Sequence, residues 1–176
     1  MSSKDNILSR INLGIAGRMG ADMAEEYSMP DIDFTPTEYA DPVAQFIKAC
    51  ETVSGAKVVR VTDMAKLPSP TARGNSSTVQ GAIAVAENGC IWIPQTEPDR
   101  TYLFKSEHLD IIVHADSIVS NMHQAYALID AGSRSGRYFS QYKFCTFISG
   151  PSKTADIEGA LVYGAQAARS VTVYIV

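Results

Sequence analysis

The chain has 176 residues, 45% of them hydrophobic and 19% charged, so it is long enough for one domain with a substantial core and too apolar for intrinsic disorder. Fifteen Lys and Arg residues against nineteen Asp and Glu residues give a formal net charge of −4, which argues against nucleic-acid binding as the main function. No apolar run approaches the ~20 residues of a membrane span, and the N-terminus shows no signal peptide. We therefore expect a cytoplasmic protein.

The first third of the chain shows one helical pattern and one clear helix start. Between Lys4 and Met19 apolar residues recur at helical spacing, whereas residues 20–39 are acidic and irregular and predict a loop or a lightly packed cover. Asp41 is typical of an N-cap, Pro42 suits the first helical turn, and Gly55 is typical of a helix end. We predict a second helix between Asp41 and Gly55.

The middle of the chain predicts strands. Residues Lys57–Thr62 are β-branched and strand-like, and the polar segment 63–78 predicts a connector. The strongest hairpin pattern follows, because residues 82–86 and 90–93 flank Asn88-Gly89, a dipeptide that readily takes positive φ at both central turn positions. We expect an antiparallel pair here.

A buried strand is predicted at Leu109–His114, followed by a helix over Ser120–Ala131 that ends before Gly132. The residues expected to face inward from this helix are Met122, Ala125, Tyr126, Leu128 and Ile129.

The last third of the chain predicts a β-loop-α-β unit. A strand over Lys143–Ser149 leads through a loop into a helix reaching about Gly164, and the strand Ser170–Val176 follows. Such a unit implies a parallel pair with a right-handed crossover. The fold class is therefore α/β, a mostly parallel sheet flanked by helices with an antiparallel hairpin. We expect residues 1–40 to form an N-terminal helix and cover, and residues 41–176 the α/β domain.

The loop between that strand and that helix is the leading candidate for ligand binding. Free N–H groups at a helix N-terminus attract anions, and α/β sheets bind ligands where strands lead into helices. Its candidate ligand-binding residues are Ser149, Gly150, Ser152, Lys153 and Thr154. The motif is not a P-loop, because it lacks the second Gly before the Lys, and a capped helix start is an equally simple interpretation.

Two residues are candidates for catalysis. Glu87, beside the hairpin tip, has a carboxylate that could serve as a base or nucleophile, although a solvated surface acid is the simpler interpretation. His108 precedes a strand and could transfer protons, although a lone histidine is more often structural. No metal-ligand spacing or nucleophile motif accompanies them.

The three cysteines, Cys50, Cys90 and Cys145, are far apart and form no CxxC pair. We interpret them as small buried hydrophobic residues in a reducing compartment. Neither a zinc site nor an iron–sulfur cluster is encoded locally, and the chain has no GxGxxG fingerprint. We therefore predict no cofactor and no metal site for this chain.

One stretch of the sequence resembles a known family. The residues Ser149–Glu158 (SGPSKTADIE) closely resemble the C-terminal signature of the lactate-utilisation protein C family, whose members contain a LUD domain. Further similar segments are Glu87-Asn88-Gly89 with Cys90-Ile91-Trp92 (the family's Glu-Thr-Gly hairpin), Arg100, Leu103 and His108-Leu109 (its Arg, Leu and His-Ile segment), and Asn6–Ile11 (its N-terminal helix). The resemblance spans the whole chain.

Two segments depart from the family pattern. Residues Gly164–Arg169 read GAQAAR where the family usually has Gly-Val-His-Gly-Pro-Arg, so the His and the Pro are missing. The connector 63–78 is shorter than the corresponding region, which usually contains another helix and strand. These departures put the family's best-known activity in this chain in question.

The resemblance implies a fold similar to the superfamily of CoA-transferases, ribose-5-phosphate isomerase and glucosamine-6-phosphate deaminase. It also implies a role in oxidising L-lactate to pyruvate alongside iron–sulfur partner proteins, with this chain as a non-redox component. Two alternatives stay open. One is an independent binder or enzyme acting on an anionic metabolite, phosphorylated or carboxylated, and the other is an interaction module whose site has decayed.

Overall fold

The computed structural model describes residues 3–18, 35–68, 75–96, 98–139, 143–156 and 159–176. It divides into two compact units, residues 1–35 and 36–176. The first unit contains the helix α1 (Ser3–Arg18), which confirms the helix predicted near the N-terminus. None of the helices within the described ranges is long and apolar enough to cross a membrane.

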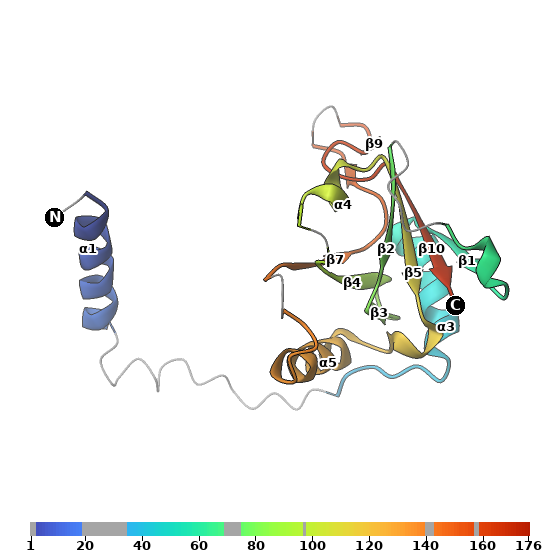
Figure 1. The fold of residues 1–176 in the computed structure, drawn as a ribbon, viewed down its shortest axis with the longest axis horizontal. Helices are drawn as coiled ribbons and strands as arrows, with labels where there is room; N and C mark the ends of the chain where they lie inside the picture. Colours follow the sequence, from blue (N-terminus) through green and yellow to red (C-terminus); the bar gives the residue numbers. More distant parts are fainter. Residues whose placement is uncertain (1–2, 19–34, 69–74, 97, 140–142, 157–158) are drawn as a thin grey trace. The chain divides into compact units, whose positions relative to one another are not determined.

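The second unit combines short helices with strands (Figure 1). Its helical elements are α3 (Pro42–Ala49), the π-helix η1 (Cys50–Ser54), the 3₁₀-helices η2 (Met64–Lys66) and η3 (Ala115–Ser117), α4 (Tyr102–Lys105) and α5 (Met122–Arg134). Its strands are β1 (Lys57–Arg60), β2 (Ser76–Gln80), β3 (Ile83–Val85), β4 (Cys90–Pro94), β5 (His108–Val113), β6 (Ile118–Val119), β7 (Cys145–Ile148), β8 (Lys153–Thr154), β9 (Val162–Tyr163) and β10 (Ser170–Ile175).

Most strands belong to two four-stranded sheets. Sheet A has the order β1-β10-β5-β2, and all of its neighbouring strands are parallel. Sheet B has the order β6-β3-β4-β7, in which β3 and β4 form the predicted antiparallel hairpin. Strands β8 and β9 form a separate two-stranded sheet. This combination confirms the α/β fold class.

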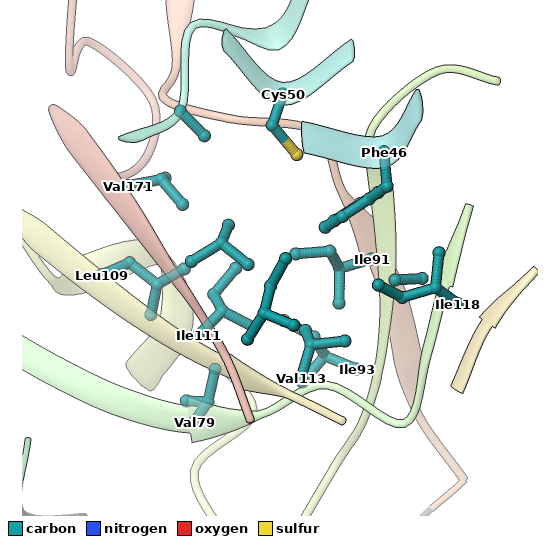
Figure 2. Close-up of a cluster of buried hydrophobic side chains, with 14 of the residues drawn as sticks. Phe46, Cys50, Val79, Ile91, Ile93, Leu109, Ile111, Val113, Ile118 and Val171 are labelled. Carbon is teal, nitrogen blue, oxygen red and sulfur yellow. The ribbon is translucent and has the colours of Figure 1, made fainter. Parts of the chain in front are cut away.

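The main core lies between the two sheets (Figure 2). From sheet A it receives alternate residues such as Leu109, Ile111 and Val113, and from sheet B Ile91 and Ile93, all of which are 1% exposed or less. Burying a side chain of this size contributes roughly 1.5–3 kcal/mol, so this layer contributes strongly to the stability of the fold. The packing of this core also fixes the positions of the strand ends of sheet A.

A smaller core covers the opposite face of sheet B. Trp92, between Ile91 and Ile93, points away from sheet A and packs with Ile83, Val85 and Ala125 of α5. Sheet B is therefore covered on both faces, by sheet A and by α5. Successive side chains of β3 and β4 point to opposite faces, and since both faces are buried, both strands are apolar throughout.

The helix predicted to begin at Asp41 is confirmed. The carboxylate of Asp41 accepts a hydrogen bond from the backbone N–H of Ala44 at 2.9 Å, and Pro42 is the first residue of α3. The helix continues as η1, which ends at Gly55 as predicted. Phe46 and Cys50 are buried against the main core, so this helical segment closes one side of it.

The prediction of a β-loop-α-β unit near the C-terminus is wrong. The residues after Ser152 form β8, which pairs with β9 at Lys153–Tyr163 and Thr154–Val162, so no helix reaches Gly164. Moreover, β7 lies in sheet B and β10 in sheet A, so these strands are not a parallel pair. Pairing between β8 and β9 outweighs the weak helical preference of the intervening sequence.

Three smaller predictions also need correction. The connector 63–78 contains the start of β2, an edge strand of sheet A. The hairpin loop spans four residues, Ala86–Gly89, in which Asn88 has negative φ and its side chain accepts a hydrogen bond from the N–H of Cys90 at 3.0 Å. On α5, Tyr126 and Leu128 are about half exposed rather than inward-facing, and Gly132 lies inside the helix.

The three cysteines have different environments. Cys50 is fully buried, whereas Cys90 and Cys145 are half-buried. Burial raises the pKa of the Cys50 thiol to about 12, so the reactive thiolate is nearly absent at neutral pH. We expect Cys50 to stay unmodified by iodoacetamide at pH 8 until the protein is unfolded, as read by mass spectrometry. Modification of Cys50 at the rate of the half-buried Cys145 in the native protein would contradict this burial.

Candidate functional site

A polar pocket of about 450 Å³ opens at the end of sheet A where its parallel strands begin. Asn75 and Glu107, just before β2 and β5, line it together with Arg169, just before β10. The other walls come from α4 with the residue after it, Phe104–Ser106, and from the segment Tyr163–Ala167. In Figure 1, α4 and β9 lie at this end of the sheet.

Backbone hydrogen bonds fasten the three strand starts to one another. The carbonyl of Asn75 accepts from the N–H groups of Glu107 at 2.8 Å and His108 at 3.1 Å. The carbonyl of Glu107 accepts from the N–H groups of Arg169 at 2.7 Å and Ser170 at 3.2 Å. The Cα positions of the polar residues are therefore fixed before any ligand arrives, which is the preorganisation that a binding site requires.

The backbone of Ser152 holds the segment 164–169 through two hydrogen bonds. Its backbone N–H donates to the carbonyl of Ala168 at 2.8 Å, and its carbonyl accepts from the N–H of Gly164 at 3.0 Å. Gly164 has φ +81°, and a Cβ at this position would lie 2.9 Å from the Cβ of Arg169. Glycine therefore allows the chain to turn closely against Arg169.

The charged side chains of the pocket are exposed and loosely paired. Arg169 Nη1 lies 3.7 Å from Glu107 Oε1, and Lys105 Nζ lies 3.0 Å from Asp99 Oδ2. The Arg169 and Lys105 side chains are 67% and 69% exposed, so each pair contributes little to stability and both cations can rearrange toward a ligand. Among the described residues of the lining, these two cations face one carboxylate, Glu107, because Asp99 lies outside the lining, and this excess favours an anionic guest.

The surroundings of Glu107 lower the pKa of its carboxyl group. Its carboxylate accepts from the Asn75 amide at 2.9 Å, and this hydrogen bond, followed by the neighbouring His108, lowers its pKa from the ordinary value. The ionised form therefore persists to a lower pH than in an ordinary glutamate. Glu107 can accept a hydrogen bond from a ligand hydroxyl but is not set up to donate a proton at neutral pH.

His108 lies next to the pocket but does not line it. Its Nδ1 is 2.7 Å from the hydroxyl of Ser170, which is the paired residue on β10. Because successive side chains of a strand point to opposite faces, His108 and Glu107 project in different directions. The catalytic role of His108 stays a prediction.

None of the five predicted ligand-binding residues lines this pocket, and their ligand-binding role stays a prediction. The hydroxyl of Ser149 donates to the carbonyl of Asn88 at 3.3 Å, and the ammonium of Lys153 donates to the carbonyl of Ser54 at the end of η1. Thr154 belongs to β8. The described residues that follow, 153–156 and 159–164, contain no helix, so the helix N-terminus used to argue for an anion site is not found there. What the structure gives Ser152 instead is the positioning of the segment 164–168.

Glu87 is separated from the pocket and contacts the start of α5. Its Oε1 accepts a hydrogen bond from the backbone N–H of Met122 at 3.0 Å, beside the N-cap Asn121. A carboxylate at a helix N-terminus satisfies a free N–H group and interacts favourably with the helix dipole. The structure thus gives Glu87 a capping contact, and its catalytic role stays a prediction.

We expect Glu87→Ala to lower the free energy of unfolding by about 1 kcal/mol, because a capping acceptor is lost, and Glu87→Gln to lower it by less. Both variants should bind small carboxylates as the wild type does. Thermal unfolding and an NMR titration measure the two effects. Normal stability combined with lost binding would instead place Glu87 in the functional site.

Sequence reasoning missed Asn75, Lys105, Glu107 and Arg169 as site residues. Each is an ordinary surface residue type without a diagnostic motif, and only the sheet order brings them together. One usable signal existed, because Arg169 ends the segment in which the sequence departs from the family pattern. Among the described residues no group of three or more His, Cys, Asp or Glu side chains could hold a metal ion.

Comparison with known proteins places this architecture in a family. Residues 79–176, more than half of the chain, match the model of the LUD domain. The fold also matches the crystal structure of a DUF162 family protein from Deinococcus radiodurans, with a TM-score of 0.55 and 15% sequence identity over 80% of this chain and 99% of that chain. Among curated proteins, none matches the sequence. The chain belongs to the LUD domain family.

Proposed function

We propose that this LUD domain protein is a non-redox component of an L-lactate utilisation system that works with iron–sulfur partner proteins. In this proposal the partners carry the electrons that leave lactate on its oxidation to pyruvate. The chain holds the small carboxylate at the amino end of sheet A. Its membership of the LUD domain family supports the assignment, and the pocket supplies the chemistry.

The observation that carries the proposal is the placement of Arg169 and Lys105 around one polar pocket. A guanidinium binds a carboxylate through two parallel N–H···O bonds, and the Lys105 ammonium adds a second positive charge. Glu107 and the amides of Asn75 and Gln166 line the same pocket and can accept or donate hydrogen bonds to a 2-hydroxyl or 2-oxo group. A 2-hydroxycarboxylate matches this combination of groups.

The pocket is open at the surface, and its mouth includes apolar side chains. Phe104 is 40% and Tyr163 is 48% exposed, and both line the opening. Exposed aromatic residues are enriched at protein interfaces. We therefore place the partner contact here, where a partner would also cover a bound carboxylate and exclude water from it.

Two measurements test the proposal. The first is an NMR titration of the purified chain with pyruvate and L-lactate, which should shift resonances of residues 104–107 and 163–169. The second is affinity purification of the tagged chain from cells grown on L-lactate, which should recover iron–sulfur proteins. Phe104→Ser should reduce that recovery, whereas Met64→Ser, at a residue 64% exposed on η2, should not.

The two results separate the alternatives. The chain is an independent binder of an anionic metabolite if it binds carboxylates but recovers no iron–sulfur protein. In that case, a strain from which the gene is deleted should grow normally on lactate. Partner recovery without carboxylate binding would identify an interaction module. If the chain binds no carboxylate and no iron–sulfur protein is recovered with it, the proposal is wrong.

A further inference from the structure

A second hollow, of about 550 Å³, lies at the opposite end of sheet A, beyond the carboxyl ends of β2 and β5. Its walls come from Ala82, which follows β2, from Asp116 and Ser117 in η3, and from the second half of α5 with the residues after it. Figure 1 shows α5 at this end of the sheet. In open α/β sheets, ligands bind in crevices outside the carboxyl ends of parallel strands, so the place itself is favourable.

Arg137 is the one cation among the described residues of this lining. It is exposed, and it forms no salt bridge with any residue that the structure describes. Its guanidinium lies 5.5 Å from the centre of the Tyr138 ring. A guanidinium without a carboxylate partner, held over an aromatic ring, is available to a carboxylate ligand.

The backbone at Arg137 and the neighbouring Tyr138 ring are held firmly in place. The N–H groups of Arg137 and Tyr138 both donate to the carbonyl of Gly132, at 2.9 and 3.1 Å. The Tyr138 ring packs so closely on Gly132 that a Cβ there would lie 2.2 Å from it, and it also contacts Trp92 edge to face, with ring centres 4.5 Å apart. The backbone at Arg137 and the ring beside its guanidinium are therefore anchored on the buried core of sheet B.

The remaining lining selects the kind of ligand. Ile83, Leu128 and Ala131 form an apolar wall, and the Leu128 side chain is half exposed into solvent. The hydroxyls of Ser117 and Ser135 donate to backbone carbonyls at 2.7 and 3.1 Å, so they add no donors for an anion.

Asp116 opposes a second negative charge. Together these groups favour a ligand with a single carboxylate and an apolar body over a phosphate or a dicarboxylate.

We infer that this hollow is a second ligand site, formed by Arg137 and the apolar face of α5, for an aliphatic monocarboxylate of medium chain length. It is independent of the amino-end pocket, because the two linings share no residue. The ligand class also differs, since the amino-end pocket has a polar wall and two cations.

Hexanoate is the probe that tests the site, in an NMR titration of the full chain. We expect saturable shifts confined to residues 82–83, 116–117 and 128–138. Arg137→Gln should weaken hexanoate binding about tenfold or more, as expected for a lost charge-assisted hydrogen bond. Arg100→Gln, at an exposed arginine that lines neither pocket, should leave it unchanged. Hexanamide, which lacks the charge, should bind as weakly to the wild type as hexanoate binds to Arg137→Gln.

Three results would overturn the inference: no saturable shift, shifts centred on the amino-end pocket, or equal binding of hexanamide and hexanoate. The spectrum of each unliganded variant reports whether it is folded. A parallel titration with pyruvate keeps this test separate from that of the proposed function, because pyruvate should shift residues 104–107 and 163–169 instead.

Discussion

Arg169→Gln should weaken pyruvate binding at least tenfold, because it removes the guanidinium that pairs with the carboxylate. A charge-assisted hydrogen bond contributes about 1.5–3 kcal/mol, and every 1.4 kcal/mol changes a dissociation constant tenfold. Thermal unfolding should change little, since the Arg169 side chain is 67% exposed and its ion pair with Glu107 is weak. NMR titration or calorimetry measures the binding, and growth on L-lactate measures its consequence in cells.

Two matched variants keep this prediction specific. Lys105→Gln should weaken binding less than Arg169→Gln, because Lys105 is partly engaged by Asp99 at 3.0 Å. Arg100→Gln should have no effect, which controls for the loss of one positive charge from the surface. Equal weakening in all three variants would show that only the overall charge matters and that the pocket is not the binding site.

Gly150→Ala is the substitution for which we expect the largest loss of stability. Gly150 has φ +69°, and a Cβ at this position would lie 2.3 Å from the carbonyl oxygen of Ser54. The left-handed conformation costs an L-residue about 1–2 kcal/mol, and displacing the end of η1 adds to that cost. We expect a total loss of about 3 kcal/mol, or roughly 6–12 °C in Tm for a chain of this size.

Gly136→Ala is the matched control. Gly136 has a similar φ of +75°, but an added Cβ would meet no atom within 4 Å. It therefore measures the conformational cost alone, about 1–2 kcal/mol. If both variants lose the same stability, the close approach of Gly150 to η1 is not a constraint. If Gly150→Ala is the less stable variant, the loop after β7 is held against η1 as the structure shows.

The fold was largely predictable because most elements carry strong local patterns. The helix from Asp41 to Gly55 has a cap at each end, and the continuous apolar runs of β3 and β4 match their burial between two cores, one on each face of sheet B. The order of the strands was not predictable. Nothing local to Ser170–Ile175 indicates that β10 inserts between β1 and β5, because the pairing depends on residues more than fifty positions away.

The candidate site was less predictable than the fold, for the same reason. The segment 155–164 contains a capping serine upstream and good helix formers, yet Val162 and Tyr163 pair with Lys153 and Thr154. A tertiary pairing thus overrides a weak propensity, and the predicted anion site loses the helix start from which it was argued. The pocket that does form combines residues from three strand starts, which no single stretch of sequence reveals.

The position of β10 also constrains the order in which this domain can assemble during synthesis. Within sheet A, β1 pairs with β10 alone, and β5 pairs with β10 and β2. Lys57 therefore has no strand partner until Thr172 has left the ribosome, and the nascent chain must keep an unpaired, β-branched strand in solution until then. Nascent chains of this protein are thus candidates for chaperone assistance, and truncations before Ser170 should aggregate rather than fold.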